Sequence, residues 1–344
     1  MSTDALVKLG IIGCGEWGSN HVRIFSHLLT SKEIVCADSN AGRLQAIQKT
    51  FLSVKTTTNY RDIIADPGIQ AVCIATPAAT HYAIAKECLE SGKDVLCEKP
   101  LCLKEEEVSH LIELAAQHKR ILMVGHVFLF NAGILALKRY IHEGALGNIL
   151  YAHSARTNLG PFRYDVDVVL DLATHDISIF NFLFDAAPLE VSARGHKCLT
   201  GQQSDLAFIT LLYPANILVN IHVSWIDPKK VRLITLVGEK KMVIWDDITQ
   251  EGPIRIYDKH VEQNIAHYET FGEYQLFSKE GDIMIPKIES YEPLKAQNAH
   301  FLECMRTRQE PMSNGRSSLS VVRVLTAIEE SMRRHGEPQP IQKE

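Results

Sequence analysis

Residues 7–18 read Val-Lys-Leu-Gly-Ile-Ile-Gly-Cys-Gly-Glu-Trp-Gly, an apolar run that ends in glycines at 13, 15 and 18. The run predicts a buried strand, and the apolar spacing of residues 18–29 predicts a helix directly after it. In this order Gly13 permits a tight turn, Gly15 lets the backbone approach a pyrophosphate, and Gly18 allows close helix–strand packing. The stretch therefore predicts the first strand–helix unit of a dinucleotide-binding domain.

The next apolar run, residues 34–37, ends at Asp38. A carboxylate at this point can accept hydrogen bonds from the adenosine ribose hydroxyls and would repel a 2′-phosphate. Together with the glycine motif it favours NAD over NADP as the cofactor. Arg43 lies nearby and is interpreted as a helix-surface residue, with the accommodation of a 2′-phosphate as the alternative.

Residues 7–126 alternate between apolar runs and helical patterns. Strands without a polar face, separated by helices, predict a doubly wound α/β domain whose parallel sheet is covered on both sides. The further strands are expected at residues 34–37, 71–75, 95–97 and 121–124, and the further helices at 43–50, 80–91 and 104–118.

After Gly125 the pattern changes to period-two alternation, which predicts an α+β domain with a large, mostly antiparallel open sheet. Its strands are expected at residues 149–157, 190–196, 206–213, 217–225, 231–237, 242–246 and 254–257, and its helices at 133–143, 168–184, 293–308 and 319–334. We therefore expect a cofactor-binding domain over residues 1–125 and a second, α+β domain over 126–344.

Length and charge exclude several classes of protein. A chain of 344 residues is long for one core, so two domains are expected. A net charge of -5 argues against nucleic acid or an anionic membrane as a partner, and no apolar run approaches the ~20 residues that span a bilayer. The eight cysteines form no CxxC pair, so no metal site is expected. Reduced thiols, and no secretory pattern in residues 1–8, predict a cytoplasmic protein.

Residues 94–100, Asp-Val-Leu-Cys-Glu-Lys-Pro, place Lys99 at the end of a short apolar run. The carboxyl ends of such strands are where α/β sheets bind ligands. Pro100 keeps the preceding residue out of the helical region, so Lys99 is expected to be extended at the strand tip. The alternative is a surface lysine in a turn.

Thr76 and Pro77 follow the strand expected at residues 71–75, and His81 lies at the start of the next helix. This turn is expected beside the cofactor ribose. For His81 the sequence leaves two interpretations open, a helix-terminal surface residue or a binding group.

Asp171 and His175 are four residues apart near the start of an otherwise apolar helix. This spacing puts both side chains on one helical face. A histidine can take the proton from an alcohol near neutral pH, and a nearby carboxylate can orient it. The alternative is a solvated face with two ordinary polar residues.

The glycine motif, Glu98-Lys99-Pro100 and the Asp171-x-x-x-His175 helix together resemble the glucose–fructose oxidoreductase / inositol dehydrogenase (Gfo/Idh/MocA) family over nearly the whole chain. The resemblance implies an N-terminal Rossmann domain, a C-terminal open-sheet domain, catalysis in the cleft between them and a cis Lys99–Pro100 bond. It implies that Lys99 contacts the reacting hydroxyl, that His175 is the acid/base and that Asp171 orients the site. The cofactor-binding residues are expected to be Gly13, Gly15, Glu16, Trp17, Gly18, Asp38, Ala75, Thr76, Pro77, His81, Glu98 and Lys99.

Three stretches look similar to sugar-nucleotide 3-dehydrogenases of that family that act on N-acetylated UDP-sugars: residues 125–131, 156–163 and 167–175. Leu129 departs from the pattern, because many relatives carry arginine there. Arginines in the second stretch could bind a diphosphate or carboxylate. They could equally lie on a loop surface or pair with Asp165 and Asp167. The substrate-binding residues are expected to be Lys99, His126, Asn131, Arg156, Asn158, Arg163, Asp171 and His175.

We therefore expect an NAD-dependent dehydrogenase that oxidises a secondary hydroxyl, at C3, of a sugar or nucleotide sugar. The alternatives are an NAD-dependent glycosidase with transient C3 oxidation, a polyol or inositol dehydrogenase, and a non-catalytic NAD-sensing regulator. The resemblance implies that residues 126–344 form a substrate-binding and oligomerisation domain, with the C-terminal helix packing back on the first domain. It also implies a homodimer or homotetramer formed through the C-terminal sheet. The alternating residues Ile217, Val219, Ile221 and Val223, with Trp225 beyond, suggest the assembly surface, unless that face packs on the domain's own helices.

Overall fold

The structure is a computed structural model that divides into two compact units. The first unit comprises residues 1–130 and 291–322, and the second comprises 131–290 and 323–344. The described residues are 7–29, 33–163, 166–199, 203–249, 251–263, 276–279 and 281–342. Most of the N-terminal stretch used above to argue against a secretory signal lies outside them.

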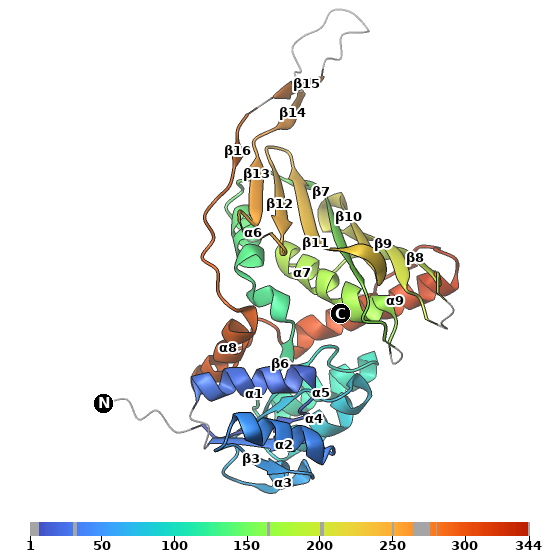
Figure 1. Ribbon diagram of the computed structural model, residues 1–344. Coiled ribbons are helices and arrows are strands. Elements are labelled where there is room, and N and C mark those ends of the chain that lie inside the picture. The colour runs from blue at the N-terminus through green and yellow to red at the C-terminus, as the bar shows by residue number, and fades with distance from the viewer. Residues whose placement is uncertain are drawn as a thin grey trace, which may run out of the picture. The chain divides into compact units, whose positions relative to one another are not determined.

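The first unit is built on a six-stranded parallel sheet in the order β3-β2-β1-β4-β5-β6 (Figure 1). The strands are β1 (Leu9–Ile12), β2 (Ile34–Ala37), β3 (Lys55–Thr57), β4 (Ala71–Ile74), β5 (Asp94–Glu98) and β6 (Leu122–Gly125). The helices are α1 (Glu16–Leu28), α2 (Ala41–Thr50), α3 (Arg61–Ala65), α4 (His81–Glu90), α5 (Glu105–Gln117) and α8 (Pro293–Thr307), with short 3₁₀ turns at η2 (Ala78–Thr80) and η3 (Val127–Phe130). The strand order reverses between β1 and β4, and ligands bind at the carboxyl ends of strands at such a point.

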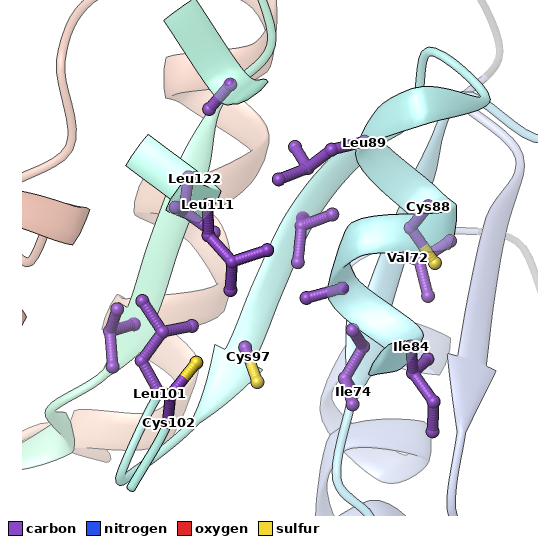
Figure 2. Packing of buried hydrophobic residues seen from close by; sticks show 14 of the residues in the cluster. Val72, Ile74, Ile84, Cys88, Leu89, Cys97, Leu101, Cys102, Leu111 and Leu122 are labelled. Atoms are coloured by element: carbon purple, nitrogen blue, oxygen red, sulfur yellow. The ribbon is translucent and has the colours of Figure 1, made fainter. Parts of the chain in front are cut away.

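Burial on both faces explains why the strands of this parallel sheet are apolar. Every residue of β1, β4, β5 and β6 is buried. Figure 2 shows side chains of β4 and β5, such as Val72 and Cys97, packed against Cys88 and Leu89 of α4 and Leu111 of α5. Burial raises the pKa of the Cys88 thiol to about 12, so it behaves as a small hydrophobe. The predicted doubly wound parallel sheet is confirmed.

The second unit contains a nine-stranded sheet in the order β16-β13-β12-β11-β7-β10-β9-β8-β17. The strands are β7 (Ile149–Leu159), β8 (Glu190–His196), β9 (Leu206–Tyr213), β10 (Ile217–Ser224), β11 (Ile226–Gly238), β12 (Met242–Asp246), β13 (Ile254–Tyr257), β16 (Ile283–Met284) and β17 (Gln339–Pro340), and β14 (His260–Gln263) pairs with β15 (Leu276–Lys279) in a separate hairpin. Among the described strands of the large sheet, β7 and β10 pair in parallel and the other pairs are antiparallel. The predicted, mostly antiparallel open sheet is confirmed.

The helices of the second unit are α6 (Ala132–His142) and α7 (Thr174–Phe184), and a π-helical turn, η4 (Val169–Ala173), leads into α7. A 3₁₀ turn, η5 (Pro214–Asn216), joins β9 to β10. Figure 1 shows α6 and α7 along one face of the large sheet. Helix α9 (Gly315–Arg333) begins in the first unit and ends in the second. In the described part of the chain, no helix is both long and apolar enough to span a membrane.

The burial of alternate residues along β10 shows that the expected assembly surface was placed on the wrong face of the large sheet. Val219, Ile221 and Val223 of β10 are fully buried, and Trp225 is only 3% exposed. The prediction that this face points outward is therefore wrong, and the alternative of a face packed within its own unit is correct. The intervening residues of β10 point outward, beginning with Leu218, which is 49% exposed. Side chains alternate between the two faces of a strand. Assigning the wrong alternate set of residues to the outside therefore moves the whole predicted surface to the other face.

Candidate functional site

The glycine loop between β1 and α1 has the local geometry that a pyrophosphate needs. Gly13 has φ +92°, and a Cβ there would lie 2.6 Å from the carbonyl oxygen of Ala75. A Cβ on Gly18 would lie 1.9 Å from the carbonyl oxygen of Gly13, so helix and loop require glycine at both positions.

Gly15 presents the open side of the same loop. Among the described residues, nothing lies within 4 Å of a Cβ built on Gly15. It is the N-cap of α1, and no side chain caps the helix there. The first N–H groups of α1 can therefore donate to an anion placed against Gly15, where the positive end of the helix dipole also favours it. The loop fits a dinucleotide pyrophosphate, with Glu16 and Trp17 exposed beside it in the first turn of α1.

Asp38 follows β2 and is buried against this loop. Its Oδ2 accepts the Cys14 N–H at 2.7 Å, and its Oδ1 accepts the Asn40 N–H at 2.8 Å. Arg43 Nη1 lies 3.5 Å from Oδ2, so this arginine is paired with the carboxylate although its side chain is 56% exposed. A carboxylate held in this way fits a ribose diol and opposes a 2′-phosphate.

Replacing Asp38 with serine is expected to shift cofactor preference toward NADP. The substitution removes the repelling charge and releases Arg43 to meet a 2′-phosphate. The ratio of kcat/KM for NADP to that for NAD should rise about 100-fold, as expected for the exchange of charged hydrogen bonds. Steady-state kinetics with both cofactors measure the ratio. The exposed carboxylate of Asp62 supplies the control, Asp62→Ser; an unchanged ratio in Asp38→Ser would show that Asp38 does not select the cofactor.

His81 contacts the backbone of both turns that follow β4 and β5. It is 1% exposed, which excludes the surface interpretation. Its Nδ1 lies 2.8 Å from the carbonyl oxygen of Pro100, and its Nε2 lies 2.8 Å from that of Thr76. The Lys99–Pro100 bond is cis, as the resemblance implied. His81 therefore fixes the backbone on one side of Lys99.

Glu98 fixes the other side of Lys99 through a buried pair that the sequence did not reveal. Its Oε1 lies 2.9 Å from His21 Nε2, and its Oε2 accepts the Lys99 N–H at 3.2 Å. Burial lowers the pKa of His21, but the Cys73 thiol and the Glu98 carboxylate outweigh burial and raise that pKa to about 10. A Cβ on Gly125 would lie 2.9 Å from Glu98 Oε1, so glycine leaves room for the carboxylate.

Asn298 of α8 completes this pair on the far side of the imidazole. Its Nδ2 lies 3.1 Å from His21 Nδ1, and its buried Oδ1 has no partner among the described residues. A protonated His21 donates from both ring nitrogens, and it therefore favours the opposite amide orientation, in which Oδ1 accepts. Both carboxylate oxygens of Glu98 thus have protein partners, and its expected contact with the cofactor stays a prediction.

His126 directly follows β6 and is 1% exposed. Among the described residues neither of its ring nitrogens has a hydrogen-bond partner. Burial lowers the pKa of His126 to about 4, with the Lys99 ammonium acting in the same direction and Glu98 opposing it. Buried polar groups without partners are uncommon in proteins, and they point to a ligand that supplies one.

The low pKa of His126 predicts a loss of stability in acid. A histidine with a pKa of about 4 when folded and 6.5 when unfolded binds more protons unfolded, so stability falls as the pH drops from 6.5 to 4. The shift corresponds to ~3 kcal/mol. Urea unfolding should show the free-energy difference between wild type and His126→Gln changing by about this amount between pH 7 and pH 4. A difference independent of pH would contradict the assignment.

Asp171 and His175 lie in the second unit, on η4 and in the first turn of α7. His175 is 9% exposed, so the interpretation as a solvated helix face is wrong. Asp171 Oδ2 accepts the Trp225 Nε1–H at 3.3 Å, and its Oδ1 accepts from Arg163 Nη1 at 3.3 Å. Trp225, expected at an assembly surface, instead holds this carboxylate.

Two other expected substrate residues have structural roles. Arg156 is buried and donates to both oxygens of the buried Asp176, from Nε at 2.7 Å and from Nη2 at 3.3 Å. Asn131 caps α6, since its Oδ1 accepts the Gly133 N–H at 2.8 Å and its Nδ2 donates to Asp247 Oδ1 at 3.0 Å.

Within the described residues the two arginines have partners that the sequence did not suggest. Arg156 pairs with Asp176, and Arg163 pairs with Asp171. Asp167 accepts the Leu170 N–H at 2.9 Å at the start of η4, and Asp165 lies outside the described residues. Asn158 donates from Nδ2 to the carbonyl oxygen of Gly160. In the described part of the chain no group of His, Cys, Asp and Glu side chains could hold a metal ion.

The fold and the glycine loop define a dinucleotide-binding α/β protein with a second, open-sheet unit. Residues 7–126 match the profile described as "Oxidoreductase family, NAD-binding Rossmann fold", and residues 134–244 match the C-terminal domain of the same family. Together the two matches span about two thirds of the chain. The chain belongs to the Gfo/Idh/MocA oxidoreductase family, and its first unit is an NAD-binding Rossmann domain.

Three known proteins illustrate the similarity. Inositol 2-dehydrogenase of Acidothermus cellulolyticus is 30% identical over 197 residues, which are 56% of this chain and 58% of that protein. UDP-N-acetylglucosamine 3-dehydrogenase of Acidithiobacillus ferrooxidans is 27% identical over 70% of this chain and 72% of its own length. The WlbA dehydrogenase of Bordetella pertussis, solved with NADH and UDP-GlcNAcA, has a TM-score of 0.78 at 20% identity and covers 98% of this chain and 99% of its own. The chain thus spans little more than half the length of the inositol dehydrogenase.

Proposed function

We propose that the protein is an NAD-dependent dehydrogenase that oxidises a secondary hydroxyl, at C3, of a nucleotide sugar such as a UDP-N-acetylhexosamine or its uronic acid. The observation that carries the proposal is the pair of polar clusters in an NAD-binding family member: Lys99 held at the tip of β5, and His175 with Asp171 in a largely buried setting. The relative from Acidithiobacillus, named for its action on UDP-N-acetylglucosamine, supports the substrate class.

In this proposal Lys99 and His175 act on the same substrate hydroxyl. His175 accepts the hydroxyl proton as general base. Asp171, held by Trp225 and Arg163, binds the substrate and orients the site. The Lys99 ammonium stabilises the negative charge that develops on the oxygen as the proton leaves. Bound NAD supplies the hydride acceptor at C4 of its nicotinamide.

The proposal assigns cofactor and substrate binding to the following residues. Gly13, Gly15 and Gly18 would hold the pyrophosphate, and Asp38 the adenosine ribose. For the substrate we retain His126, whose two ring nitrogens have no partner in the described structure, together with Asn158 and Arg163. We omit Arg156, because it is buried against Asp176, and Asn131, because it caps α6 and binds Asp247.

A screen of substrates tests the proposal. UDP-N-acetylhexosamines, their uronic acids and free inositols are incubated with NAD, and NADH absorbance is followed. Turnover of the nucleotide sugars supports the proposal. Turnover of inositol alone would favour the second candidate, a polyol dehydrogenase, which the relative from Acidothermus supports. Release of a glycosidic substituent without net NADH would indicate a glycosidase, and NAD binding without turnover of any substrate would indicate a sensor.

We also propose that the chain assembles with copies of itself through the outward face of the large sheet. Leu218 faces Tyr151 on β7, which is 47% exposed. His222 on the same strand stacks on Phe208 of β9 with ring centroids 4.5 Å apart. Exposed apolar side chains on adjoining strands support a surface that association would cover. Sedimentation equilibrium tests this, and a monomer at micromolar concentration would contradict it.

A further inference from the structure

A cavity of the first unit lies at the opposite end of the Rossmann sheet from the glycine loop. Its volume is about 480 Å³, and its walls come from the end of α5, the turn into β6 and the segment that leads into α9. All of these belong to the first unit. It adjoins the start of β6, whereas NAD-binding domains use the carboxyl ends of the strands. The cavity is therefore separate from the cofactor site.

Basic side chains dominate the polar wall of this cavity. The lining includes Lys119, Arg120, Arg308 and Arg316, against the single carboxylate of Glu310 in the described lining. Glu310 Oε1 accepts from Asn314 Nδ2 at 2.7 Å, so this carboxylate is already engaged. An excess of cations on the wall of a cavity attracts an anion.

Arg308 is the anchored member of the group. Its Nη1 lies 2.8 Å from both oxygens of Asp94, a fully buried carboxylate that also accepts the Ile121 N–H at 2.9 Å. Its side chain remains 50% exposed. Asp94 thus fixes one edge of the guanidinium, and the described residues supply no acceptor for its Nε and Nη2 groups. These groups are positioned to donate to a ligand.

Arg120 is a further basic side chain of the wall, and one of its donors lies below the surface. Its Nε is buried and has no hydrogen-bond partner among the described residues. A guanidinium N–H group withdrawn from water without an acceptor costs free energy, and buried groups of this kind are normally satisfied by protein, water or ligand.

Apart from Asn314 and Gly315, the remaining lining is apolar, and it defines the rest of the ligand. These apolar residues are Ile112, Ala115, Ala116, Ile121, Leu122 and Pro311. The start of α9 packs tightly on this floor, because a Cβ on Gly315 would lie 2.7 Å from Ile112 Cγ1. A preformed apolar floor with a few convergent polar groups is the usual composition of a small-molecule site.

We propose that this cavity binds a small organic anion that joins a phosphate or carboxylate group to an apolar body. Arg120, Arg308 and Arg316 hold the anionic group by charge-assisted hydrogen bonds. The apolar part of the lining, which includes Ile112 and Leu122, receives the apolar body. The ligand occupies the protein together with NAD, since the two sites lie at opposite ends of the sheet.

Calorimetric titration with phenyl phosphate, which has both parts, tests the site on protein saturated with NADH. We expect one molecule bound per chain, and binding of inorganic phosphate at least about tenfold weaker because it lacks the ring. Arg120→Gln and Arg316→Gln should each weaken phenyl phosphate binding by about tenfold or more. Both variants should retain NADH affinity, which reports that the first unit is folded.

Arg333→Gln is the matched control, because Arg333 is an exposed arginine of α9 that lies in the second unit and pairs with Glu330. It should bind phenyl phosphate as the wild type does. The proposal is overturned if phenyl phosphate does not bind, if NADH displaces it, if the Arg120 and Arg316 variants bind it normally, or if Arg333→Gln weakens it equally.

Discussion

Replacing Lys99 with methionine is expected to lower kcat by about a thousandfold while leaving NADH affinity within a few-fold of wild type. The methionine fills a similar volume but removes the cation that stabilises the developing alkoxide, and the loss of one such group costs ~10²–10³ in rate. Because His81 and Glu98 hold the backbone of this turn, the substitution should leave the fold intact. Steady-state kinetics and fluorescence titration with NADH measure the two quantities.

The control for this substitution is Lys104→Met, which removes an exposed lysine five residues along the chain. It should retain wild-type kcat. If Lys99→Met also retained wild-type kcat, the assignment of Lys99 to the reaction would be wrong, although the family assignment would stand.

Replacing His175 with glutamine is expected to reduce kcat by about 10²–10⁴-fold, the usual contribution of a general base. The variant should also lose the acid limb of the pH profile of kcat/KM, since glutamine cannot accept the proton. This second readout separates proton transfer from a structural role, which would lower activity without changing the shape of the profile.

His142→Gln supplies the comparison, because His142 is an exposed histidine on α6 of the same unit. Its activity and pH profile should match wild type. A His175 variant that keeps an acid limb would assign the proton acceptor to another residue.

Most elements could be predicted because their apolar spacing is regular. The bounds expected for residues 34–37 and 190–196 match β2 and β8. β3 was missed because its residues, Lys-Thr-Thr, form a partly exposed edge strand without an apolar pattern. The start of the helix expected from residue 168 is a π-helical turn, and hydrophobic spacing over so few residues does not distinguish it from an α-helix.

Local motifs could be predicted from the sequence, whereas contacts between residues distant in sequence could not. The glycine loop and Asp38 form the expected arrangement within 26 residues of chain. Arg156 was matched to carboxylates close in sequence, yet its partner Asp176 lies 20 residues away on another element. His21 and Asn298 are 277 residues apart, and spacing along one chain carries no signal for such a pair.

Transfer of deuterium from the substrate to the cofactor tests the central claim most directly. A UDP-N-acetylhexosamine labelled with deuterium at C3 is incubated with NAD, and the NADH formed is analysed by mass spectrometry. The account predicts NADH that carries the deuterium at C4 of the nicotinamide, at a rate that falls when Lys99 or His175 is replaced. NADH without the label, or label lost to solvent, would contradict oxidation at C3 by direct hydride transfer.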